Sequence, residues 1–287
     1  MHQNIEKELT LPGKWRLGSM AQRPVAPGDI VKVTKAGKVL GLIDVLPRQN
    51  EFTRKVAGLR TLPQVAAANI DQVLIMAAIE APRTSLGLID RLLVTASIGH
   101  VECRLIINKC DLATPDRIRE LRQIYANAQI PVHFISIETG DGVEPVKELL
   151  HSKITLLAGQ SGVGKSSLTN LVEPGLDLRT AEVSHVTGKG RHITTSARLH
   201  PLTTGGWLID TPGLRECAPW GLTKRNLLEA FPEIEANAGE CKFRNCLHKD
   251  ELGCTVTTAI EIGDIPKSRY DTYRKLLIEA ERNERKY

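Results

Sequence analysis

Apolar and polar positions alternate in three different ways along the chain and divide it into three regions. From about Trp15 to Val56, short runs such as KVTKAGKVLGLIDVL alternate between apolar and polar side chains and carry Gly37 and Gly41 at expected bends. This pattern is typical of short strands joined by turns. We therefore expect residues 1–66 to form a small β-barrel or part of one.

From Asn69 the pattern changes to apolar strands that alternate with helical segments. The expected strands are DQVLIMAAI, RLIINKCD, PVHFISI, ITLLAGQS, Ser196–Leu202 and GGWLIDTPG, and the expected helices lie near Ser85–Gly99, near Asp116–Asn127 and from Gly164. This alternation predicts a mostly parallel sheet with crossover helices over residues 67–221, with the strand order left open. Beyond about Leu222, short helical stretches, a Cys-rich turn and a charged helix from Lys267 predict an α-helical domain over residues 222–287.

Composition adds limits on size, compartment and partners. A length of 287 residues exceeds the usual size of a single core, which agrees with several domains. No apolar run approaches about 20 residues, and the first residues, MHQNIEKELT, lack the apolar core of a signal peptide. We expect a cytoplasmic monomer without a membrane partner. The net charge of +5 favours a polyanionic partner but does not by itself indicate nucleic acid.

The string GQSGVGKS matches the phosphate-binding P-loop pattern and stands between an expected strand and an expected helix. Glycines let backbone N–H groups surround phosphates, Lys165 reaches the β- and γ-phosphates, and the Ser166 hydroxyl can bind Mg²⁺. A chance glycine loop is the alternative, which the flanking elements disfavour. The expected nucleotide contacts are Gly159, Gln160, Ser161, Gly162, Val163, Gly164, Lys165, Ser166 and Ser167.

The segment NKCDL supplies a residue that can recognise the base. The Asp111 carboxylate can accept hydrogen bonds from N1–H and the 2-amino group of guanine, whereas adenine would leave it unpaired. An ordinary Asp at a turn is the alternative if the motif stood alone. It is followed by SIETG, whose backbone N–H groups can meet the guanine oxygen. The expected base contacts are Asn108, Lys109, Cys110, Asp111, Ser136 and Ile137.

Two further strings fit the same nucleotide. DTPG closes the strand WLID, which puts Asp210 where it can hold Mg²⁺ through water and Gly213 near the γ-phosphate. Upstream, GKGRHITTSARL is rich in hydroxyls, and we expect Thr194, rather than Thr195, to bind Mg²⁺. Guanine recognition thus precedes phosphate recognition in the chain, the reverse of the common order, which predicts a circularly permuted GTPase domain. The segment after DTPG then leads directly into the C-terminal domain, which loss of the γ-phosphate could reposition.

Cysteines cluster near the C-terminus. Cys241, Cys246, His248 and Cys254 form the spacing C-x4-C-x-H-x5-C, which supplies the four ligands of a closed tetrahedral site. Four protein ligands favour one structural Zn²⁺ over a hydrolytic metal. The alternative is a coincidental group of buried thiols. Basic residues accompany the ligands and continue along the last helix, although glutamates alternate with them.

Together, NKCD before GQSGVGKS, followed by GRHITT, DTPG and CKFRNCLH with its final Cys254, resemble the ribosome small subunit-dependent GTPase A (RsgA) family. The resemblance runs from about Pro24 to the C-terminus. It implies an N-terminal OB-fold, a permuted P-loop GTPase and a C-terminal zinc domain that bind the small ribosomal subunit and its rRNA late in maturation. It also implies GTP hydrolysis to GDP, slow alone and stimulated by that subunit, with release of assembly factors.

The same resemblance implies a catalytic arrangement. A hydrophobic residue, here Leu214, replaces the water-positioning glutamine of other GTPases, and His192 compensates for it. Lys165 and Thr194 are the other expected catalytic residues. A loop histidine that contacts RNA or solvent is the alternative for His192. Ile193 departs from the family's frequent threonine, and only about 20 residues precede the segment RPVAPGDIV, so the barrel lacks its first strand or carries an atypical one. A nucleotide-gated RNA-binding module and a P-loop kinase remain as rival functions.

Overall fold

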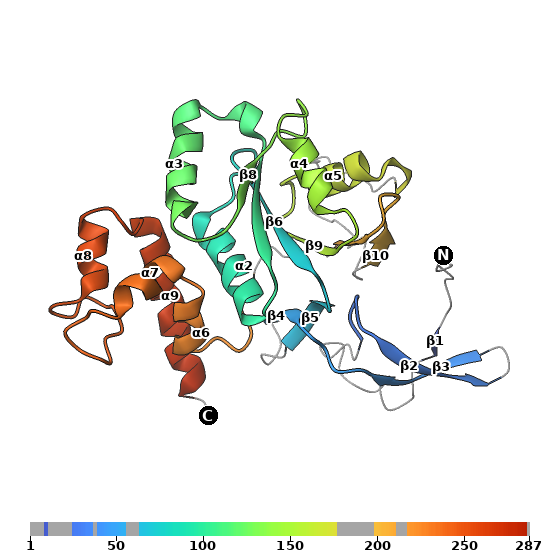
Figure 1. Cartoon of the computed structure of the whole chain (residues 1–287), viewed down its shortest axis with the longest axis horizontal. Helices are drawn as coiled ribbons and strands as arrows, with labels where there is room; N and C mark the ends of the chain where they lie inside the picture. The colour runs from blue at the N-terminus through green and yellow to red at the C-terminus, as the bar shows by residue number, and fades with distance from the viewer. Residues whose placement is uncertain are drawn as a thin grey trace, which may run out of the picture.

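The computed structural model describes residues 9–10, 25–36, 39–55, 63–176, 198–210 and 217–285. Its centre is a six-stranded sheet, with a strand-rich part on one side and a helical part on the other (Figure 1). The N-terminal strands extend away from the central sheet, while the C-terminal helices lie beside α2 (Figure 1). The arrangement agrees with the multidomain α/β fold expected from the sequence.

The central sheet has the strand order β10-β11-β9-β6-β7-β8, and all its neighbouring strands are parallel except β10 and β11. The strands are β6 (Gln72–Ala78), β7 (Cys103–Asn108), β8 (Val132–Phe134), β9 (Ile154–Ala158), β10 (Arg198–Pro201) and β11 (Trp207–Asp210). Because the carboxyl ends of parallel strands share one edge, the segments that follow β7, β8 and β9 gather there, together with Asp210 at the end of β11. These are the segments that carry the nucleotide motifs.

Alternating side chains of β6 separate two layers of the core. Val73, Ile75 and Ala77 pack with α2 (Leu86–Ile98) and α3 (Pro115–Ala126), whereas Leu74 and Met76 pack with α4 (Val143–Leu149) and α5 (Lys165–Val172). Two-residue periodicity sends successive strand side chains to opposite faces, so a strand that is apolar at every position requires cover on both. The continuous apolar run of β6 therefore predicts a sheet with helices on both faces.

The helix boundaries follow from capping residues. α2 begins after Ser85, whose hydroxyl accepts a hydrogen bond from the Leu88 amide, and ends at Gly99. α3 begins after Thr114 with Pro115 at its first position, one residue earlier than expected. The described residues of the central part also form two short one-turn helices, η1 (Cys110–Leu112) and η2 (Pro174–Leu176).

The described residues of the N-terminal region form five strands in two small sheets. β2 (Val31–Ala36) and β3 (Val39–Val45) pair antiparallel, and β1 (Leu9–Thr10) pairs parallel with β3. β4 (Glu51–Lys55) and β5 (Pro63–Ala68) form an antiparallel ribbon. A strand ahead of the segment RPVAPGDIV is thus described at Leu9–Thr10, and its role as the first strand of a barrel stays a prediction. Phe52 of β4 is fully buried in the central core, which attaches this ribbon to the sheet.

The C-terminal part consists of α6 (Lys224–Glu229), α7 (Pro232–Ala238), α8 (Thr255–Glu261) and α9 (Lys267–Glu284). Its apolar core includes Val94 of α2, so the two parts share one buried interface. α9 spans 18 residues but is highly charged. Among the described residues, no helix is long and apolar enough to cross a membrane.

A buried charged triad crosses the same interface. Arg269 of α9 donates hydrogen bonds to Asp90 of α2 at 2.6 Å and to Glu233 of α7 at 2.7 Å, and all three side chains are at most 2% exposed. The guanidinium also lies 4.4 Å from the centre of the Phe231 ring. Burial raises the pKa of the Asp90 carboxyl, an effect that the Arg269 charge opposes. Loss of one partner would leave a buried charge without compensation.

We predict that Arg269→Ala lowers the free energy of unfolding by about 3–5 kcal/mol, because two buried carboxylates lose their cation. Arg274→Ala is the matched control, since Arg274 lies on the same helix and pairs with Asp250 at the surface. The control should cost about 1 kcal/mol or less. Chemical denaturation followed by circular dichroism measures both. Equal losses in the two variants would contradict a special role for the triad.

Candidate nucleotide-binding pocket and metal centre

The P-loop connects β9 to α5 and bends closely around the end of β6. Gly159 adopts a φ of +152° directly beside the Met76 carbonyl, where a Cβ atom would clash with the backbone. Gly164, with a φ of +103°, caps the N-terminus of α5. The Lys165 ammonium donates to the carbonyl oxygens of Gly159 at 2.9 Å and Gln160 at 2.7 Å. The lysine is thus held inside the loop that a phosphate would enter.

Asn108 joins the base-reading segment to the P-loop. It ends β7 and is 2% exposed. Its Nδ2 donates to the Val163 carbonyl at 2.8 Å, and its Oδ1 accepts from the Ile137 amide at 3.2 Å. One side chain therefore connects the segments that follow β7, β8 and β9. A Cβ atom on Gly164 would collide with the same amide nitrogen.

The Asp111 carboxylate is oriented by a neighbouring hydroxyl. Ser136, 1% exposed, donates from Oγ to Asp111 Oδ1 at 2.5 Å and accepts from the Thr139 amide at 3.2 Å. From the sequence we expected only the backbone N–H groups of this loop to contact guanine, and the hydrogen bond between the Ser136 and Asp111 side chains was not predicted. An oriented carboxylate suits two parallel donors such as those of guanine.

The two motifs line one pocket of about 510 Å³. Its wall combines Asp111 from the β7 side with Lys165 and Ser166 from the P-loop. The other lining residues expected from the sequence are Asn108, Lys109, Ile137, Ser161, Gly162, Gly164 and Ser167. Leu112 and Glu138 also line it and were not expected. The size and the mixed polar lining fit a nucleotide-sized ligand.

Three of the expected contact residues have other surroundings. The Val163 side chain is fully buried in the core beneath the loop, so only its backbone faces the site through Asn108. The Cys110 thiol donates to the Ile107 carbonyl at 3.3 Å, and burial raises its pKa. Gln160 directs its side-chain amide to the Pro82 carbonyl, 3.4 Å away.

The segment Ala81–Thr84 supports this pocket, a role that was not predicted from the sequence. Lys109 Nζ donates to the Ala81 carbonyl, and Pro82 lies against Gly162. Thr84 accepts a hydrogen bond from the Ala78 amide at 2.9 Å. This bond holds the end of β6 against the turn that leads into α2. A proline shortly after a central strand, Pro82 after β6 (Gln72–Ala78), was the available signal, although proline at such a place usually indicates only a turn.

Asp210 ends β11 and pairs in register with Leu157 of β9, so it lies near the P-loop. Its Oδ1 is buried and has no hydrogen-bond partner among the described residues. Burial raises the pKa of the Asp210 carboxyl, and the charges of Lys165 and His200 oppose that shift. A buried carboxylate oxygen without a donor suits a cation or its bound water. The other expected residues of this region, His192, Thr194, Gly213 and Leu214, lie outside the described residues.

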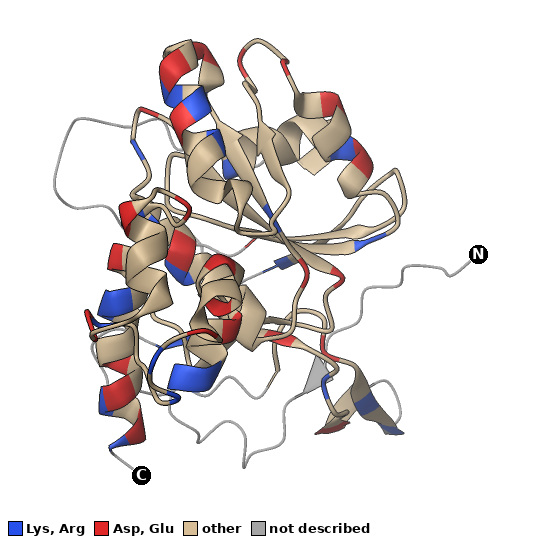
Figure 2. Ribbon diagram, turned by 60° about the vertical axis from the view of Figure 1, so that its left-hand side comes forward, with Lys and Arg blue, Asp and Glu red and all other residues tan. Residues whose placement is uncertain are grey.

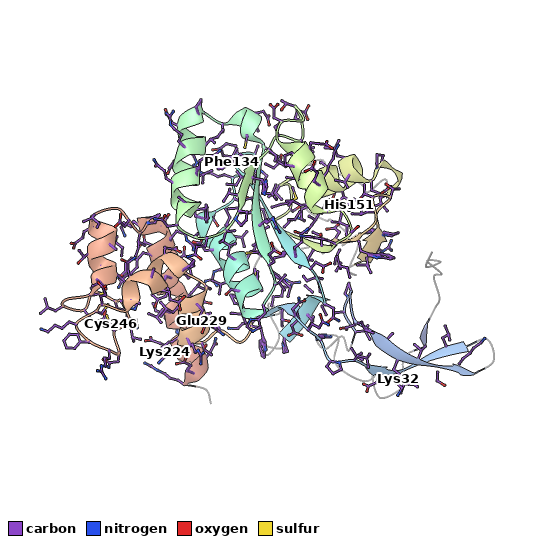
Figure 3. All side chains as sticks on the ribbon, in the orientation of Figure 1. Lys32, Phe134, His151, Lys224, Glu229 and Cys246 are labelled. Carbon is purple, nitrogen blue, oxygen red and sulfur yellow. The ribbon has the colours of Figure 1, made fainter. Side chains whose placement is uncertain are left out.

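The four C-terminal ligands converge. The ligand atoms of Cys241, Cys246, His248 and Cys254 all lie within 4.8 Å of one another. His248 Nδ1 is 3.6 Å from Cys241 Sγ and 3.5 Å from Cys254 Sγ, and the two sulfurs are 4.0 Å apart. Zn–S bonds of about 2.3 Å and tetrahedral angles require sulfurs separated by about 3.8 Å. Figure 3 shows Cys246 in the C-terminal part, well away from the central sheet that carries Phe134.

Comparisons with known proteins agree with this geometry. The family model described as RsgA GTPase matches residues 45–220. A curated relative from Gemmatimonas aurantiaca, "Small ribosomal subunit biogenesis GTPase RsgA", is 40% identical over 88% of this chain and 83% of its own length. The crystal structure of YjeQ from Thermotoga maritima has a TM-score of 0.72 at 36% identity, covering 95% of this chain and 89% of the other. The crystal structure of YloQ, titled a circularly permuted GTPase, has a TM-score of 0.66 at 27% identity, covering 98% and 89%.

We predict that Gly164→Ala weakens nucleotide binding by about tenfold or more, because the new Cβ displaces the Asn108 amide and strains the backbone. Gly263→Ala is the control, since Gly263 also has a positive φ, +85°, but no atom within 4 Å of a new Cβ. Titration with a fluorescent guanine nucleotide measures both. Unchanged affinity in the Gly164 variant would remove the role assigned to this contact.

Proposed function

The chain belongs to the RsgA GTPase family, and we propose that it hydrolyses GTP in this pocket during maturation of the small ribosomal subunit. The single observation that carries the proposal is the shared pocket, in which Asp111 and Lys165 face one ligand-sized space. A base and a triphosphate belong to one molecule, so groups that recognise each must lie in one cavity. A P-loop kinase has no requirement for a guanine-reading aspartate.

Each part of the pocket has a defined task. Asp111, oriented by Ser136, accepts hydrogen bonds from guanine, and Asn108 holds this segment at a fixed distance from the P-loop. Lys165 and the loop amides bind the phosphates. Ser166 and Thr194, with Asp210 acting through water, would hold Mg²⁺, which would neutralise charge on the phosphates. His192 positions the attacking water in place of a glutamine, and Gly213 contacts the γ-phosphate.

The Cys241, Cys246, His248 and Cys254 group holds one structural Zn²⁺ in our proposal. Burial lowers the pKa of the His248 imidazole, which favours the neutral ring that binds metals. With four protein ligands no position remains for a hydrolytic water. The Tyr270 hydroxyl donates to the His248 carbonyl at 2.7 Å, so the metal turn also supports α9.

The partner is the small ribosomal subunit and its rRNA. The relatives' names and the net charge of +5 support this assignment. Figure 2 shows Lys and Arg interspersed with Asp and Glu along α9, so this helix offers scattered phosphate contacts rather than a continuous basic face. Residues 1–66 and 222–287 are the proposed RNA-binding domains on either side of a GTPase domain at 67–221. A cytoplasmic monomer fits this role.

The test is GTP hydrolysis measured with and without purified small subunits, for the wild type and for Asp111→Asn. We expect subunits to stimulate the wild type with GTP. The variant should lose at least about 100-fold in GTP affinity, because two charge-assisted hydrogen bonds are lost, and should gain activity with xanthosine triphosphate. Absence of that switch would contradict guanine recognition by Asp111. GTP-dependent subunit binding without stimulation would favour an RNA-binding module instead.

We further expect Cys246→Ala to release zinc, because three ligands bind the metal much more weakly than four. Metal content is measured by inductively coupled plasma mass spectrometry, and guanine nucleotide affinity serves as the internal control. The C-terminal part should become sensitive to proteolysis while nucleotide affinity stays unchanged. A variant that retains one zinc per chain would exclude Cys246 as a ligand.

A further inference from the structure

One aromatic side chain of the C-terminal part is exposed to solvent. Phe243 is 48% exposed, whereas every other Phe, Tyr and Trp that the structure describes is buried or half-buried. It lies between Cys241 and Cys246 in residues 241–254, here called the metal turn. Single exposed apolar side chains are common on protein surfaces, so exposure alone indicates no ligand. The surroundings of the ring decide whether it has one.

Two cations accompany the Phe243 ring. Lys242 and Arg244 flank it in the sequence, and both are exposed. Lys249 of the same turn pairs with Glu281 at 2.6 Å, whereas no ion pair forms at Lys242 or Arg244 within the described residues. The Lys242 ammonium lies over the Phe243 ring, 5.6 Å from its centre. An exposed aromatic surface and two cations without an ion-pair partner thus occupy one short stretch of chain.

Hydrogen bonds hold the backbone beneath this ring in place. The Lys242 amide donates to the Gly253 carbonyl at 3.0 Å, and the Cys246 amide donates to the Phe243 carbonyl at 3.2 Å. The Glu251 carboxylate accepts from two further backbone amides of the metal turn. A ligand that binds to a backbone already held in this way loses less affinity to the ordering of the protein.

An unpaired RNA base fits this arrangement. Bases splayed out of a single strand can stack on an aromatic ring, whereas bases inside an A-form duplex are already stacked on one another. The phosphates on either side of such a base carry the negative charge that Lys242 and Arg244 attract. A pocket of a protein partner would also cover the ring, but lysine is depleted at the centre of protein–protein interfaces. The two cations therefore favour a polyanion.

We propose that Phe243 is a stacking platform for an unpaired RNA base, with Lys242 and Arg244 bound to the phosphates beside that base. Cys246, close to Phe243 in the sequence, lies at the periphery of the C-terminal part, where a large RNA can reach it (Figure 3). The mixed charges of α9 contact phosphates only here and there, whereas the metal turn binds one defined nucleotide. The identification of this RNA as rRNA rests on the proposed function.

Binding of a fluorescent oligoadenylate of about ten nucleotides to the full chain tests the stacking. We expect Phe243→Leu to weaken binding about tenfold, because leucine is apolar but has no ring on which a base can stack. Phe243→Trp keeps an aromatic ring and should bind within about twofold of the wild type. Fluorescence anisotropy measures each affinity. Equal affinities of the wild type and the leucine variant, or no measurable binding by the wild type, would overturn the proposal.

Tryptophan fluorescence reports the stacked base directly. In Phe243→Trp, oligoadenylate should quench the emission of the added indole, because a base stacks on it. Leu252→Trp is the matched control, since Leu252 lies on the same metal turn and is 79% exposed. Polyphosphate, which carries the charge without the bases, should quench neither variant. Equal quenching by oligoadenylate in both variants, or none at position 243 while RNA is bound, would exclude the platform.

The salt dependence of oligoadenylate binding tests the two cations. Lys242→Gln/Arg244→Gln should lower the slope of log affinity against log salt concentration by about 1.4, because each phosphate contact with a single strand contributes about 0.7. Arg225→Gln/Lys267→Gln removes the same charge from side chains that are 90% and 76% exposed, and it should leave the slope unchanged. Equal decreases in both double variants would contradict phosphate contacts at Lys242 and Arg244.

Co-sedimentation with purified small subunits, in the presence of a non-hydrolysable GTP analogue, tests whether rRNA supplies the base. Phe243→Leu should bind subunits about tenfold more weakly, while its guanine nucleotide affinity and zinc content stay at the wild-type level. Wild-type subunit binding by this variant would overturn the assignment to rRNA. If Leu252→Ala weakens subunit binding and Phe243→Leu does not, the metal turn contacts a protein instead. A wild-type chain that binds oligoadenylate through Phe243 but binds no subunits would count against the proposed function alone.

Discussion

The buried amide of Asn108 is the contact on which the site depends. It accepts from the loop after β8 and donates to the loop after β9, while Asp111 lies in η1, the one-turn helix that follows its own strand. An unsatisfied buried amide costs free energy, so both bonds hold the two loops at a constant separation. Guanine recognition and phosphate binding can then address a single molecule even though their segments lie in permuted order.

Permutation is tolerated because the sheet, not the chain order, positions the motifs. β9 lies between β11 and β6, so the P-loop has the Asp210 strand on one side and the β6–β7 pair on the other. New chain ends change which segment connects to which domain and leave the edge with the motifs intact. The strand-rich N-terminal region now enters at β6, and the C-terminal domain follows directly after β11.

Local features of the fold could be predicted from the sequence, and long-range ones could not. Ser85 and Gly99 give α2 its ends, and the P-loop string gives the β9–α5 turn, because capping and loop geometry depend on neighbouring residues. Strand order, the brace at Pro82 and the Ser136–Asp111 contact depend on partners far apart in the chain. The Asp90–Arg269 pair spans 179 positions, and each residue alone resembles an ordinary surface charge. The roles of His192, Thr194 and Gly213 remain predictions.

The Asp90–Arg269 pair also affects how the protein folds during its synthesis. A nascent chain emerges from its N-terminus, so α2 leaves the ribosome long before α9 is synthesised. Until then the Asp90 carboxylate and the apolar side of α2 have no counterpart, and the GTPase sheet can form but cannot close its outer helix layer. The protein therefore cannot complete its fold until α9 has been synthesised. A chain that ends before Arg269 would expose the uncovered side of α2 to chaperones and proteases.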